Sequence, residues 1–290
     1  MRTALVALLL FPVAALAEDP APAAVTDSAS LWAGRVDEAT LKLALAAFEV
    51  EQKANPTDRK ALAALARGWY FYGDAFTDDV PTKLERWQKA IDAGNTCLAL
   101  NAEYKARLEG GEKEKDAAVV GKAEDVPCLY WTSTALGKWA KAQSLSVTLK
   151  HLPTVKAYMT KVEELDPTYF NYGPARYWGA YNAALPSFAG KDLVKSEEYF
   201  KASIEGAPDY LASRVLRAEM LDVQKQDMKA FEDDLNYVIA ADPGKLLECK
   251  PENLKEQEKA KKLLAKKDEL FASATDAPAA EDGKKKSKGK

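Results

Sequence analysis

The sequence predicts an all-α protein of tetratricopeptide-like helical hairpin repeats stacked into a right-handed superhelix. Three amphipathic segments end at a small or acidic residue followed by proline, at Pro167, Pro208 and Pro243. These prolines, which cannot continue a helix, lie 41 and 35 residues apart. A helical hairpin that recurs at such a period cannot bury its apolar face alone, so it must stack on its neighbours.

The second helix of such a hairpin carries small residues around an aromatic one, and segment 190–208 follows this pattern. Ser196 and Ser203 are the small residues, and Phe200 is the aromatic residue between them. Small residues let neighbouring helices approach, and the ring fills the space one turn away. Segment 39–56 keeps the same spacing, so we predict about five helices of this type.

Composition fits one elongated repeat domain. Hydrophobic residues make up 47% of the chain, which is ample for a core. The 41 Lys and Arg residues nearly balance the 44 Asp and Glu residues. We therefore expect neither nucleic acid nor an anionic membrane surface to bind the folded part.

The N-terminus has the pattern of a secretory signal peptide. A basic residue precedes the apolar run 4–17, which ends in Ala-Leu-Ala. We predict cleavage after Ala17, a flexible Pro- and Ala-rich leader over 18–30 and a soluble periplasmic protein. The apolar run is short for a bilayer span, so we expect no stable membrane insertion. A retained anchor is the alternative.

The first long helix is expected to begin at Asp37, which can cap it. Its partner, 58–73, ends in four consecutive aromatic residues, among them Tyr70. Successive residues spread around a helix, so these four cannot share one face. Some must contact the next repeat or line the inside of the curve. A further helix is predicted over 83–100.

The repeat pattern is interrupted at 103–125, a polar, glycine-bearing insertion that we interpret as a long loop, or as an irregular insertion with a helical turn. A helix resumes over 126–143. There Tyr130, Trp131 and Trp139 provide more aromatic surface than one buried stripe needs.

Three cysteines leave two readings open. Cys97 precedes the insertion and Cys128 follows it, so a disulfide between them in an oxidising compartment would link the two ends of the insertion. Alternatively, all three, including Cys249, are small apolar residues in helix interfaces.

Residues typical of catalytic sites are sparse. The single histidine, His151, lies beside Pro153, where we expect a helix boundary and a capping or surface role. One histidine excludes multi-histidine zinc sites, and Gly110-Gly111 is no phosphate-binding loop. Paired acidic residues are expected on solvated helix faces: Glu163-Glu164, Glu197-Glu198 and Asp233-Asp234. We therefore predict no enzyme, no metal and no cofactor.

The richest candidate binding surface follows Pro174, which suits the first turn of a helix. Tyr177, Tyr181 and Leu185 then share one face at four-residue spacing, while Arg176 points elsewhere. First helices of stacked hairpins line a concave surface, where Arg176 could bind a ligand carboxylate. The alternative is an ion pair with an acidic residue of a neighbouring repeat. The candidate ligand-binding residues are Tyr70, Tyr130, Trp131, Trp139, Tyr172, Arg176, Tyr177, Trp178, Tyr181 and Asn182.

Segment 171–221 resembles the T-component family of TRAP transporters (the TatT family). The resemblance rests on a Gly-Pro-x-Arg helix start, an aromatic stretch ending in Leu-Pro, a Gly-x-Asp turn and a Ser-x-x-x-Phe helix. It extends over about 31–271 and implies a periplasmic helical-repeat protein with a central pore or pocket, a homotrimer and a solute-binding receptor as partner. The residues that match the family motif are Gly173, Pro174, Arg176, Leu185 and Pro186.

The domain prediction is a repeat domain over 31–271, followed by a disordered, lysine-rich tail over 272–290. We predict an accessory of a TRAP-type uptake system that binds a small organic acid, a hydrophobic ligand or the receptor on its concave face. The alternative is an envelope scaffold that binds a protein or peptide and has no transport role.

Overall fold

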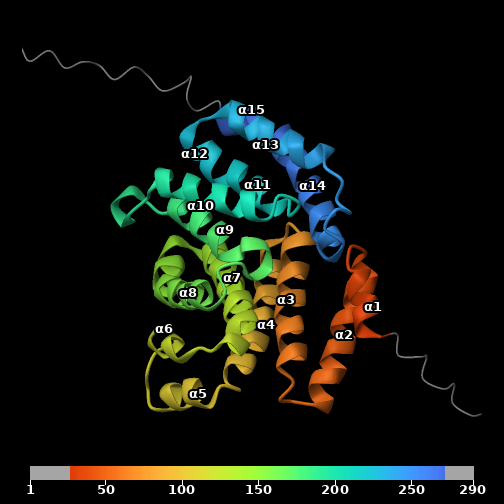
Figure 1. The fold of residues 1–290 in the computed structure, drawn as a ribbon, viewed down its shortest axis with the longest axis vertical. Helices are drawn as coiled ribbons and strands as arrows, with labels where there is room; N and C mark the ends of the chain where they lie inside the picture. The colour runs from red at the N-terminus through yellow and green to blue at the C-terminus, as the bar shows by residue number, and fades with distance from the viewer. Residues whose placement is uncertain (1–26, 272–290) are drawn as a thin grey trace, which may run out of the picture.

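The computed structural model describes residues 27–271, and every regular element in that range is helical (Figure 1). The predicted signal peptide and tail lie outside the described residues. The α-helices are α1 (Ser28–Ala33), α2 (Glu38–Ala54), α3 (Arg59–Ala75), α4 (Val80–Leu98), α5 (Ala102–Glu109), α6 (Glu114–Ala117), α7 (Val126–Gln143), α8 (Leu145–Leu165), α9 (Tyr169–Ala184), α10 (Leu193–Gly206), α11 (Ala212–Arg217), α12 (Val223–Lys225), α13 (Met228–Ala240), α14 (Lys250–Ala265) and α15 (Lys267–Phe271). Short 3₁₀ turns are η1 (Ala118–Val120), η2 (Ala123–Asp125), η3 (Ser187–Ala189) and η5 (Leu247–Cys249), and η4 (Ala218–Asp222) is a π-helical turn.

Long helices pack on one another in chain order, α2 on α3, α3 on α4, α4 on α7, α7 on α8 and α9 on α10. This succession is compatible with the predicted superhelix of helical hairpins. The chain then turns back, so that α14 lies near α1 (Figure 1). None of the helices in the described range combines the length and the apolar composition needed to cross a bilayer.

Polar caps fix where the helices begin. The Asp37 carboxylate accepts from the backbone N–H of Thr40 at 2.8 Å, as predicted, and Asp58 caps α3 in the same way. Such caps satisfy amide groups that have no partner within the helix. Asp27 caps α1, so residues 28–30 belong to a helix rather than to the predicted leader.

The insertion is mostly helical rather than a long loop, because its buried side chains join the main hydrophobic core. Tyr104 on α5 is buried, and its hydroxyl lies 2.6 Å from that of Tyr158 on α8. Asp125 is also buried; it accepts from the side chains of Asn101 at 2.7 Å and of Arg59. A disulfide joins Cys97 to Cys128 at the base of the insertion, with Cα atoms 5.9 Å apart.

Two sequence-based expectations are wrong, one about a helix boundary and one about a solvated helix face. His151 lies inside α8, because Ser144 caps this helix well before Pro153. Its ring packs edge-on against Trp139, with centroids 5.7 Å apart. Asp234 is not solvated: it is 2% exposed and binds Arg217 at 2.5 Å and Arg214 at 2.9 Å. The charge pattern of α13 alone does not reveal that two arginines of α11 bind this carboxylate.

A buried ion cluster, which we call the clasp, ties α14 to the first helices. Glu252 on α14 accepts from Arg35, at 2.5 Å and 3.2 Å, and from Arg67 on α3 at 2.9 Å. Arg35 also donates to the carbonyl oxygens of Trp32 and Glu248. Partners more than 180 residues apart thus hold the two ends of the repeat together.

Candidate functional site

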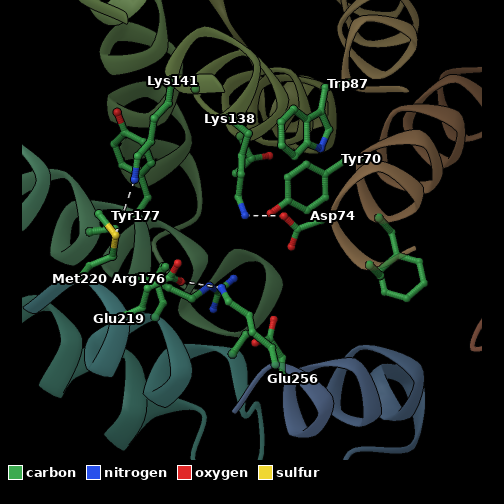
Figure 2. Close-up of a pocket in the computed structure, with 18 of the residues that line it drawn as sticks. Tyr70, Asp74, Trp87, Lys138, Lys141, Arg176, Tyr177, Glu219, Met220 and Glu256 are labelled. Atoms are coloured by element: carbon green, nitrogen blue, oxygen red, sulfur yellow. Dashed lines mark hydrogen bonds and ion pairs between the residues drawn. The ribbon is translucent and has the colours of Figure 1, made fainter. Parts of the chain in front are cut away.

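Helices α3, α7, α9, α11 and α14 and the turn η4 surround a cavity of about 1000 Å³. Figure 2 shows Tyr70 and Asp74 on one side of it, with Arg176 and Glu256 across from them. This volume is at the upper end of the range for small-molecule sites.

The cavity wall contains a distorted turn at the start of α9. Phe170, Asn171 and Tyr172 adopt left-handed backbone angles, with φ of 47°, 57° and 56°. This conformation costs roughly 1–2 kcal/mol for each L-residue, so it persists only where other contacts enforce it. The regular helix begins after these residues, which places Pro174 in its first turn.

The Gly-Pro-x-Arg segment has a physical role at each motif position. A Cβ at Gly173 would lie 2.5 Å from the ring of Tyr130, so only glycine permits this approach. Arg176 then donates to the hydroxyl of Tyr130 at 2.8 Å. Its other donors reach the carbonyl oxygens of Asn171 at 3.0 Å and Phe170 at 3.2 Å, which the left-handed turn directs toward it.

Arg176 is a buried cation without an acidic partner. Its side chain lines the cavity, the residue is 7% exposed, and its guanidinium carbon lies 4.5 Å from the ring centroid of Tyr210. No carboxylate lies within ion-pair distance of Arg176 among the residues the structure describes. The ion pair that sequence analysis left open is thus not formed within this range. Two backbone carbonyl groups, the hydroxyl of Tyr130 and the ring of Tyr210 stabilise the positive charge of Arg176 in part. This charge makes the adjacent part of the cavity electropositive.

Six of the ten candidate residues line the cavity: Tyr70, Tyr130, Trp131, Arg176, Tyr177 and Tyr181. Tyr177 and Tyr181 lie on one face, as expected, with stacked rings 6.0 Å apart. Arg176 reaches the same cavity, although we expected it to point elsewhere.

The other four candidates lie outside the lining. Trp178 is buried against Tyr181, and Asn182 donates to the carbonyl oxygen of Trp178 within α9. Tyr172 packs against Gly206, and Trp139 packs against His151. Leu185 is buried at the end of α9, where Pro186 follows it.

Sequence reasoning missed the charged part of the lining. Lys138 on α7 pairs with Asp74 on α3, and Lys259 on α14 pairs with Glu219 on η4 at 2.6 Å. Burial opposes the charge of each group, but the partners outweigh it: the pKa of Asp74 is lowered and that of Lys138 is raised. These four residues are far apart in the sequence, and they come together only in the folded protein.

Three further charged residues of the lining form no ion pair within the described residues: Glu256, Lys141 and Lys266. Glu256 on α14 has neither a hydrogen bond nor an ion pair within residues 27–271, and burial raises the pKa of its carboxyl group. Lys141 on α7 has only the sulfur of Met220, at 3.8 Å, and its side chain is exposed.

The fold and this cavity define an all-α helical-repeat protein with an internal pocket. The family model described as TRAP transporter T-component matches residues 36–271, so the chain belongs to that family. The resemblance drawn from the sequence is thereby confirmed. No curated protein matches the chain at a significant level.

Proposed function

We propose that this T component holds a small organic acid in the cavity, with Arg176 binding its carboxylate. Membership of the family supports a role as an accessory component of TRAP transport. The ligand, the periplasmic location and the receptor partner are parts of the proposal. They fit a chain whose sequence begins with a signal-peptide pattern.

The observation that supports this proposal best is the contrast between Arg176 and the other arginines. Every other arginine in the described range has a carboxylate within 4.0 Å; these residues are Arg35, Arg59, Arg67, Arg86, Arg107, Arg214 and Arg217. Arg176 alone lacks one, and it is also among the most deeply buried. A buried charge without a counter-ion is costly, so a ligand carboxylate would supply the missing partner.

The rest of the lining suits the body of such a ligand. Aromatic side chains from α3, α7 and α9 surround Arg176, and Leu216 and Met220 add apolar surface. Apolar walls with a few placed polar groups are typical of small-molecule sites. An Arg- and Tyr-lined pocket favours this proposal over the protein-binding scaffold, which would need an open groove. Assembly into a homotrimer remains a prediction from the family resemblance.

Native mass spectrometry of protein purified from a bacterial periplasm tests the proposal. We expect a bound mass that is lost on denaturation and is absent from Arg176→Gln. Arg107→Gln is the matched control, because Arg107 lies on the insertion and pairs with Glu103 and Glu112 on the surface. A bound mass that persists in Arg176→Gln, or an empty wild-type protein, would contradict the proposal.

A further inference from the structure

The cavity also has an acidic residue that forms no ion pair within residues 27–271. Three carboxylates and three ammonium groups gather on its α14 side, and two ion pairs, Asp74 with Lys138 and Glu219 with Lys259, join four of them. The third ammonium group, on Lys141, contacts the sulfur of Met220. Glu256 is the carboxylate left over, without a partner among the described residues.

The charges of Glu256 and Arg176 act on the same small region. The phenol of Tyr70 has a pKa well above its usual value, first because it is buried and then because of the charges of Asp74, Tyr130 and Glu256. The charge of Arg176 opposes this effect. Tyr70, Arg176 and Glu256 also line the same cavity, which is the geometric basis of this shared effect. Figure 2 shows Tyr70 facing the side of the cavity where α9 and α14 place them.

This arrangement selects the charges of a ligand. A carboxylate opposite Arg176 and an ammonium opposite Glu256 would each gain a partner, and neither would disturb the two existing ion pairs. The tyrosine rings that line the cavity add faces that attract an ammonium group. A dianion would instead bring a second negative charge toward Glu256, where repulsion raises its cost.

Building on the proposed function, we propose that the ligand is zwitterionic, with its carboxylate on Arg176 and an ammonium group on Glu256. A cavity of about 1000 Å³ leaves room for a body larger than a single amino acid between the two charges. A short peptide with apolar side chains has this chemistry. Such a ligand would span the cavity from α9 to α14.

Titration calorimetry with one dipeptide in three forms separates the two charges. The probes are L-phenylalanyl-L-phenylalanine, its N-acetyl form, which lacks the ammonium group, and its C-terminal amide, which lacks the carboxylate. We expect each modification to weaken binding to the wild-type protein at least about tenfold, as for other buried charge pairs.

Variants assign each charge to its residue. In Glu256→Gln the free and N-acetyl forms should bind within about twofold of one another, as should the free and amide forms in Arg176→Gln. Glu109→Gln, on the surface of α5, should bind like the wild type.

The outcomes also separate this inference from the proposed function. Equal binding of the free and N-acetyl forms, with the amide still weak, would overturn the zwitterion and leave the organic acid standing. Equal binding of the free and amide forms, or no binding of any form, would overturn the carboxylate site and the inference with it.

Discussion

Arg35 and Arg176 are the two most deeply buried arginines of the described chain, and their surroundings are opposite. Arg35 meets the carboxylate of Glu252, whose second partner is Arg67. Arg176 meets a phenol and two backbone carbonyls, and it faces a cavity. A carboxylate from the chain makes the first arginine part of the fold. Contacts with the chain hold the second arginine in position, and we propose that a ligand supplies its counter-charge.

The effects of the two arginines on stability can be judged against a residue of the hydrophobic core, where we expect the largest loss. Phe200 is fully buried, and its ring lies so close to Gly179 that a Cβ there would come within 2.8 Å of it. Phe200→Ala should lower the free energy of unfolding by roughly 3–5 kcal/mol through lost burial and the cavity created. Urea denaturation of the variant and the wild type measures this loss. A loss below about 0.5 kcal/mol, typical of surface positions, would refute the repeat register.

The clasp should respond almost as strongly. Glu252→Gln removes the charge that both Arg35 and Arg67 use, leaving two buried cations unpaired. We expect a loss of about 3 kcal/mol in the free energy of unfolding. Glu109→Gln provides the surface control in the same denaturation series, and equal stability of the two variants would show that the clasp does not hold α14.

A second matched pair, Asp222 and Asp234, extends the comparison to carboxylates. Asp234 has two arginine partners, whereas Asp222 Oδ2 is buried without one in the described range. Burial, reinforced by the charge of Asp234, raises the pKa of Asp222 from 3.8 to about 7. The folded state therefore holds a proton that the unfolded state releases, so stability falls as pH rises from about 4 to 7.

Asp222→Asn should remove this dependence. We expect the variant to exceed the wild type by about 1–2 kcal/mol in unfolding free energy at pH 8, and by much less at pH 4. Denaturation at several pH values checks the slope. Parallel profiles for the two proteins would mean that Asp222 titrates normally.

The smallest effect should come from the buried arginine of the cavity. Arg176→Gln loses four hydrogen bonds, to Tyr130, Phe170, Asn171 and Ser213, but also removes the cost of burying an unpaired charge. We expect the free energy of unfolding of the ligand-free protein to change by less than about 1 kcal/mol. A loss as large as that of Glu252→Gln would instead assign Arg176 to the fold.

The sequence predicted the helical framework well, because its signals are local. Asp37 caps a helix by its own side chain, Phe200 follows the repeat spacing, and Pro174 opens the regular part of α9. Four consecutive aromatic residues cannot share one helix face, so the sequence predicted that some of them face a second surface, and Tyr70 lines the cavity.

The remaining features depend on contacts distant in the sequence. Nothing in the neighbourhood of Glu256 indicates that it lines a cavity together with Tyr70, since α14 and α3 are distant in the sequence and the clasp links them in the folded protein. The left-handed turn before Gly173 contains no glycine in the strained positions, so no local rule predicts it. His151 was misplaced because Pro153 was treated as a helix boundary, although α8 continues through it.

The most direct test of the central claim is a crystal structure of protein purified from the periplasm with its bound ligand retained. We expect electron density in the cavity, with two ligand oxygen atoms at about 2.8 Å from the guanidinium of Arg176. Density elsewhere with an empty cavity, or a carboxylate of the protein itself on Arg176, would contradict the account.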